Sequence, residues 1–225
     1  MAAHSPSLRS PSSLGTLLAL ADSRLPTGGH VHSGGAEEAV TSRLVIDLTT
    51  LEAFLRRRIR TSGLVAASIA VAVHRGDLTV ADADAETDAR TPAPAARQAS
   101  RAQGRGLLRL ARRVWPVPDQ DLAWDALGAR PHLAVAAGRV GLVSGLQPEQ
   151  TALSIVYTTM TGTATAAQRL LALDPTDVAA LTFALAQLCE QTAHDAVAGL
   201  ADLSDPLLDE LAQRHAQRER PLFVS

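Results

Sequence analysis

Residues 149–172 read EQTALSIVYTTMTGTATAAQRLLA. The large apolar side chains of this stretch recur at spacings of three and four residues, which places them on one face of an α-helix. The preceding Gln147-Pro148-Glu149 is typical of a helix start, because proline fits the first turn and an acidic side chain there faces the positive end of the helix dipole. The stretch therefore predicts a long amphipathic helix that packs against a core. Its apolar face consists of Leu153, Val156, Tyr157, Met160, Ala164 and Leu171.

The same helical spacing recurs in both directions along the chain. Apolar faces of this kind lie in residues 51–59, 107–115 and 181–192. No segment alternates β-branched and polar residues as a half-buried strand would. Alanine and leucine dominate, and aromatic residues make up only 3% of the chain. The pattern predicts an all-α protein.

Helix boundaries are also visible in the sequence. Asp174-Pro175 and Asp205-Pro206 each combine a capping residue with a proline in the first turn, and Thr49-Thr-Leu-Glu52 matches a capping box. We expect a single-domain bundle of about nine to ten helices over residues 14–225, after a disordered tail at 1–13. The predicted helices are 14–22, 35–43, 50–75, 77–89, 93–114, 132–144, 149–172, 175–200 and 205–219.

Composition excludes several classes of protein. The chain has 225 residues and no lysine, so all 21 basic residues are arginine. A Walker A loop, a pyridoxal-phosphate Schiff base and a protein-kinase site each require a lysine. The single cysteine, Cys189, excludes an internal disulfide and favours a reducing, cytoplasmic compartment. The net charge of −2 gives no general attraction to nucleic acid or to membranes, and no apolar run is long enough to span a bilayer.

No catalytic motif is complete. Residues 141–145 read GLVSG, whose spacing is wrong for a nucleophile elbow, and the sequence has no H-E-x-x-H zinc motif. His30 and His32 could pair on a metal, but two histidines are fewer ligands than a stable site needs. The residues alone therefore identify no catalytic side chain, no metal site and no cofactor of this chain's own.

A stripe of arginines follows one predicted helix. Arg97, Arg101, Arg105 and Arg109 recur every four residues, so they share one slowly turning face. A solvated helix face is the simpler interpretation. The alternative is a surface for an acidic protein or a phosphate-bearing partner, since guanidinium groups bind carboxylate and phosphate in bidentate fashion. Nucleic acid is a further alternative, although aromatic residues for base stacking are scarce.

The helix of residues 149–172 carries a second polar pattern. Thr158, Gly162, Thr165 and Arg169 share a face that is distinct from the apolar one. The small residues would allow another backbone to approach closely, or they serve ordinary helix packing. Arg169 at the end of this face is harder to explain by packing, and it suggests an interface.

The loop before the second predicted helix is rich in glycine. Residues 17–37 read LLALADSRLPTGGHVHSGGAE, with four glycines among residues 28–35. Glycine permits unusual backbone angles and close approach. The spacing does not fit a dinucleotide-binding loop, and Ser33 is a candidate helix cap.

Residues 17–37 resemble the N-terminal segment of the urease accessory protein UreF family. That family has leucine-proline-x-glycine-glycine, an aromatic residue, serine and then glycine-leucine-glutamate. His30 here replaces the aromatic residue. Further matches follow in the same order over residues 14–225, and the lysine-free composition suggests a GC-rich, actinobacterial genome. These matches are residues 86–90, 97–110, 132–145, 166–173, 206–209, His215 and 222–225.

The resemblance implies an all-helical, dimeric scaffold that performs no covalent chemistry. UreF-like proteins join UreD (also called UreH) and the GTPase UreG in a complex that activates apo-urease by nickel insertion, with GTP hydrolysis performed by UreG. The complex handles the nickel, and direct binding of nickel to this chain stays open. The alternative is a GTPase-activating regulator of UreG that supplies an arginine, either Arg169 or Arg101.

The resemblance also implies which residues contact partners. Residues of the glycine loop would help to recruit UreG, and Arg169 matches a basic position at the UreG interaction. The C-terminal tail would contact UreD. The loop residues are His30, His32, Ser33 and Glu37, and the tail residues are His215, Leu222 and Phe223.

Overall fold

The computed structural model describes residues 13–22, 25–27, 29–117 and 123–224, without the side chains of Ser13 and His30. The predicted tail at 1–13 lies outside this range except for Ser13. Within the described residues the chain forms ten α-helices and no strand, so the all-α prediction is confirmed. The helices are α1 (Ser13–Leu20), α2 (Ala36–Thr41), α3 (Leu48–Arg58), α4 (Leu64–Arg75), α5 (Val80–Ala89), α6 (Pro94–Val114), α7 (Leu133–Val143), α8 (Pro148–Leu171), α9 (Pro175–Ala198) and α10 (Pro206–His215).

Side-chain caps fix several helix starts. The Asp174 carboxylate accepts hydrogen bonds from the backbone N–H groups of Thr176 and Asp177, and Asp205 caps α10 in the same way. Both predicted starts are confirmed. The predicted capping box of Thr49 and Glu52 is wrong, because the helix begins two residues earlier than predicted, at Leu48, and its capping box consists of Asp47 and Thr50.

The predicted helix of residues 50–75 is interrupted by a π-turn. The segment η2 (Ile59–Gly63) separates α3 from α4. The hydroxyl groups of Thr61 and Ser62 donate to backbone carbonyls one turn back, at Arg57 and Arg58. Such side-chain bonds compete with the regular helical ladder and locally widen it.

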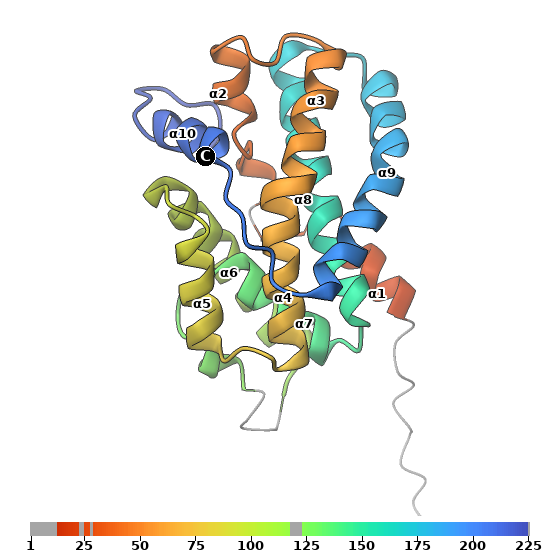
Figure 1. Cartoon of the computed structure of the whole chain (residues 1–225), viewed down its shortest axis with the longest axis vertical. Coiled ribbons are helices and arrows are strands. Elements are labelled where there is room, and N and C mark those ends of the chain that lie inside the picture. The colour runs from red at the N-terminus through yellow and green to blue at the C-terminus, as the bar shows by residue number, and fades with distance from the viewer. Residues whose placement is uncertain (1–12, 23–24, 28, 118–122, 225) are drawn as a thin grey trace, which may run out of the picture.

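Helix α4 lies at the centre of the molecule, between α5 on one side and α9 on the other (Figure 1). One face of α4 contributes Ala67, Ala70 and Val71 to a core shared with α2, α3, α8, α9 and α10. Its opposite face contributes Ile69 and Val73 to a second core shared with α6 and α7. The two short 3-10 segments, η1 (Gly29–Val31) and η3 (Trp124–Leu127), lie in the connecting loops.

No helix in the described part of the chain combines the length and the apolar character that crossing a bilayer requires.

Candidate partner-binding site

A buried carboxylate of α2 joins this helix to the C-terminal tail. Glu37, in the first turn of α2, is only 2% exposed. Its Oε1 accepts a hydrogen bond from the Leu222 N–H (2.9 Å), and its Oε2 accepts one from the Phe223 N–H (3.0 Å). The His215 Nε2 atom, at the end of α10, lies 2.9 Å from the same Oε2. Glu37 therefore ties the C-terminal tail to the glycine loop.

The surroundings of Glu37 favour its ionised form. Burial alone would raise the pKa of this carboxyl group. The hydrogen bonds from the two tail amides and from His215 more than offset that effect, so the pKa of Glu37 is lowered. A charge-assisted hydrogen bond to a backbone amide is stronger than a neutral one. The tail is thus held by an ionised carboxylate.

The tail leaves apolar side chains on the surface while it is held. Leu222 is 79% exposed and Val224 is 68% exposed, whereas Phe223 between them packs against the first core. The Val224 N–H donates to the carbonyl of Val31 in η1 (2.7 Å). We call this arrangement of the glycine loop, Glu37, His215 and residues 222–224 the tail–loop junction. It brings together the predicted residues Glu37, His215, Leu222 and Phe223, which sequence reasoning had assigned to two separate surfaces.

The other predicted loop residues lie at or near this junction. His32 and Ser33 are buried, and the Ser33 hydroxyl has no hydrogen-bond partner among the described residues. Ser33 does not cap α2 with its side chain, because the N-cap is Gly35 in a left-handed conformation. The side chain of His30 lies outside the described residues.

Two arginines at the junction were missed by sequence reasoning. Arg218 lies between α2 and the tail, and it donates to Glu38 and to the Thr41 hydroxyl (both 2.9 Å). Arg58 donates to the carbonyl of Gly34, and burial lowers its pKa to about 10. Arg58 belongs to a run of three arginines in α3, and the sequence does not indicate which of the three faces inward.

Arg169 lies on an exposed face of α8. Its side chain makes no hydrogen bond or ion pair with another described residue. Thr165 on the same face is exposed, and a Cβ atom added to Gly162 would meet no heavy atom within 4 Å. Packing within this chain therefore does not account for the small residues at 162 and 165.

Arg101 has a different environment. Its guanidinium donates to Asp84 (2.7 Å) and Asp88 (3.1 Å) of α5 and to the carbonyl of Arg130. It clamps α6 to α5 and to the loop before α7, and its assignment as a partner-binding residue stays a prediction. His132 completes the network, because its Nε2 lies 2.9 Å from Asp88.

Asp84, Asp88 and His132 lie close enough together to suggest a metal site. The internal contacts account for these groups without a metal. Arg101 binds both carboxylates, and the Nδ1 atom of His132 lies 3.0 Å from the Ser100 hydroxyl. Burial lowers the pKa of His132, whereas its hydrogen bond to Asp88 favours the charged form.

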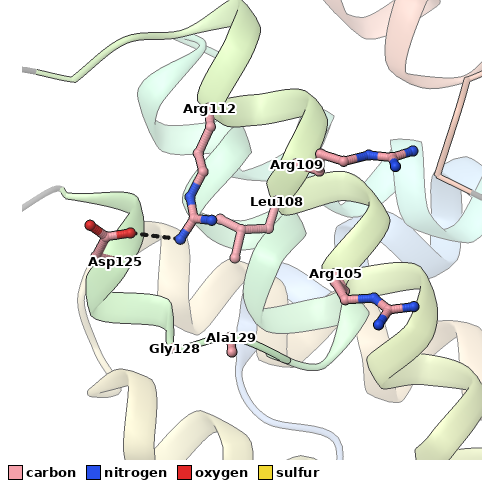
Figure 2. Close-up of a pocket in the computed structure, with 7 residues that line it drawn as sticks. All are labelled: Arg105, Leu108, Arg109, Arg112, Asp125, Gly128 and Ala129. Carbon is pink, nitrogen blue, oxygen red and sulfur yellow. Dashed lines mark hydrogen bonds and ion pairs between the residues drawn. The ribbon is translucent and has the colours of Figure 1, made fainter.

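The C-terminal half of α6 borders a pocket of about 500 Å³. Figure 2 shows Arg105 and Arg109 extending from the same side of the helix, with Leu108 between them and Arg112. The guanidinium of Arg112 donates to Asp125 of η3 (2.6 Å). The residues that line this pocket are Arg105, Leu108, Arg109, Arg112, Asp125, Gly128 and Ala129.

The fold and these surfaces define an all-α protein with exposed arginine and apolar side chains beside internally paired polar groups. The UreF family model matches residues 45–186. The chain belongs to the UreF family of urease accessory proteins. It is 74% identical over 217 residues to the urease accessory protein UreF of Mycolicibacterium vanbaalenii, covering 95% of this chain and 100% of that protein.

Other relatives agree with this assignment. The UreF protein of Mycobacterium marinum is 72% identical over 94% of this chain and 99% of its own length. That of Mycobacterium tuberculosis is 71% identical over 95% of this chain and 99% of its own length. The predicted family and its actinobacterial character are confirmed. Membership in an accessory family implies a helper role.

Proposed function

We propose that this chain is a non-enzymatic scaffold in the maturation of the urease nickel centre. In this proposal it acts as a homodimer that binds UreD (UreH) and the GTPase UreG, and the resulting complex delivers nickel to apo-urease. Nickel is the cargo of the complex rather than a resident cofactor of this chain. The location in the cytoplasm stays a prediction.

The tail–loop junction carries this proposal. A surface that must bind a partner needs apolar side chains held in a fixed position, because ordering a loose tail on binding costs conformational entropy. Glu37 holds the backbone of the tail, and Leu222 and Val224, the neighbours of Phe223 in the chain, remain exposed. We assign these two side chains to the contact with UreD.

Co-expression with UreD followed by light scattering on a sizing column tests this assignment. The wild-type chain should elute as a larger, stoichiometric complex. The variant L222S/V224S should lose the complex and keep the helical content of the wild type, because both side chains are exposed. The matched control L44S/I46S removes two exposed apolar side chains between α2 and α3 and should keep the complex. The assignment would be contradicted if both variants lost the complex with UreD to the same extent, or if neither variant lost it.

Helix α9 offers the surface that we propose for the homodimer. Phe183 is 82% exposed, and Ala179, Ala180 and Ala184 around it are exposed as well. Burying a phenylalanine side chain contributes about 1.5–3 kcal/mol. F183S should therefore shift the isolated chain toward monomer at low concentration. A dimer with unchanged concentration dependence would place the interface elsewhere.

Arg169 keeps the alternative of a GTPase-activating role open. Arg169 is exposed and makes no hydrogen bond or ion pair with another described residue, so it is available to reach a phosphate in a partner, whereas Arg101 is held by α5. R169A and the control R60A, another exposed arginine, should be compared for GTP turnover by UreG and for urease activation. An unchanged turnover with lost activation in R169A would favour the scaffold. A turnover that falls by several powers of ten would favour the GTPase-activating role.

A further inference from the structure

The arginine stripe on α6 divides into two halves with different electrostatic environments. In the N-terminal half, the carboxylates of α5 lie within ion-pair distance of Arg97 and Arg101. In the C-terminal half, no hydrogen bond or ion pair joins Arg105 or Arg109 to another described residue. The regular spacing of the sequence continues across both halves, so the difference arises from the tertiary contacts between α5 and the N-terminal half of α6.

The C-terminal half, in which Arg105 and Arg109 have no ion pair with a described residue, borders the pocket that Figure 2 shows. The Gly128–Ala129 segment forms one wall, and the buried side chain of Leu108 lies between Arg112 and the other two arginines (Figure 2). Asp125 pairs with Arg112, but its side chain is 91% exposed. An exposed ion pair of this kind contributes little to stability, so a competing carboxylate can displace Asp125 at small cost.

We infer that the arginine pocket, made by Arg105, Arg109 and Arg112, is a docking site for an acidic segment of a partner protein. Residues four apart on a helix have Cβ atoms about 6 Å apart. Alternate side chains of an extended segment are about 6.6 Å apart on one face. Arg105 and Arg109 extend from the same side of α6, so they match two carboxylates at alternate positions.

A protein partner fits this pocket better than nucleic acid does. No aromatic side chain lines the pocket, and single-stranded nucleic acid is bound largely by stacking on aromatic residues. The chain also carries a net charge of −2, which opposes long-range attraction to a polyanion. The pocket shares no residue with the tail–loop junction, so this inference goes beyond the proposed scaffold role and does not depend on it.

Fluorescence anisotropy with the full chain tests the inference. The probe is a short labelled peptide that alternates glutamate and serine, and the control peptide has glutamine in place of each glutamate. The wild-type chain should bind the glutamate peptide at least tenfold more tightly than the glutamine peptide. Binding should weaken with added salt, because exposed charges are screened.

Two double variants test whether the glutamate peptide binds at the arginine pocket. R105Q/R109Q should weaken binding of the glutamate peptide at least fivefold. R56Q/R60Q makes the same change in net charge on α3 and η2 and should stay within twofold of the wild type. Equal effects of the two double variants, or binding of the glutamine peptide as tight as that of the glutamate peptide, would overturn the inference. So would tighter, R105Q/R109Q-sensitive binding of a single-stranded oligonucleotide, which would instead identify a nucleic-acid surface.

Discussion

The Glu37 carboxylate binds two tail amides and His215 at the tail–loop junction. Substitution by glutamine removes its negative charge with little change in the size of the side chain. In E37Q the amide N–H₂ group must face one of the two tail N–H groups, so one of these donors loses its acceptor. Loss of a hydrogen bond to a charged group costs about 1.5–3 kcal/mol. We expect E37Q to release the tail while the remaining fold stays intact.

Limited trypsinolysis measures that release, because trypsin cleaves this lysine-free chain only after arginine. Cleavage after Arg218 should become faster in E37Q than in the wild type. The control E52Q removes a carboxylate of α3 that is paired with Arg56, away from Arg218 and the tail. Equal cleavage rates in E37Q and E52Q would mean that Glu37 does not hold the tail.

His74 predicts how stability depends on pH. The residue is buried near the end of α4, with Nδ1 2.9 Å from the Thr151 hydroxyl. Burial, reinforced by the charge of Arg75, lowers its pKa below the ordinary histidine value of 6.5. The unfolded chain therefore binds a proton at a higher pH than the folded chain does, and stability falls as the pH drops below 6.5.

Urea unfolding at a series of pH values checks this sign. H74N should reduce the loss of stability between about pH 7 and about pH 5, although His132, whose pKa burial also lowers, retains its share. The exposed residue His194 is the control, and H194N should leave the profile unchanged. A wild-type stability that rises as the pH falls through this range would contradict the prediction.

The sequence identifies most of the individual residues at these sites but does not indicate which of them contact one another. Glu37 and His215 are 178 positions apart, so no local pattern indicates that they form one buried pair. Arg101 and Arg105 belong to the same four-residue repeat of arginines, yet only Arg101 is paired with α5 carboxylates. Periodicity predicts the face of a helix, whereas the neighbour of that face is determined by tertiary packing.

At the scale of the helices, replacing each of two glycines by alanine should change the free energy of unfolding in opposite directions. A Cβ atom added to Gly138 of α7 would lie 2.4 Å from the carbonyl oxygen of Ala70 in α4. That contact involves backbone atoms, so α4 and α7 must separate, and overpacking of this kind costs about 1–3 kcal/mol. G138A should therefore lower the free energy of unfolding.

G162A provides the comparison on α8. A Cβ atom there meets nothing within 4 Å, and alanine favours a helix over glycine by about 0.5–1 kcal/mol. Chemical denaturation should show that G162A is more stable than the wild type. If the open face of α8 contacts a partner, the same variant should assemble less well. Equal stabilities of G138A and G162A would contradict the packing argument.

The helices themselves were largely predictable because their boundaries depend on local chemistry. Aspartate-proline starts predicted α9 and α10, and both were confirmed. The π-turn at Ile59–Gly63 was not predicted, because apolar spacing continues through it and the competing hydroxyl bonds involve only two residues. The pairing of α5 with α6 was also not predicted, since an acidic helix has the same sequence pattern whether it faces solvent or arginine.

At the scale of the whole molecule, α4 links two hydrophobic cores that share few other residues. Ala67 and Ala70 belong to one core, and Ile69 and Val73 to the other. Because these residues alternate along one short helix, the two cores cannot separate unless α4 itself unfolds. The two cores should therefore unfold in one cooperative transition, as expected of a single domain.

L185A tests this cooperativity, because the two cores carry different spectroscopic probes. Leu185 is fully buried in the first core, which α8 and α9 share, whereas Trp124 and Trp115 belong to the second core. Truncation of a buried leucine costs about 2–5 kcal/mol. If α4 couples the cores, tryptophan fluorescence in L185A should shift to lower denaturant by the same amount as circular dichroism at helical wavelengths. A fluorescence transition that stays at the wild-type midpoint would mean that the cores unfold independently, and that the chain consists of two units joined by α4.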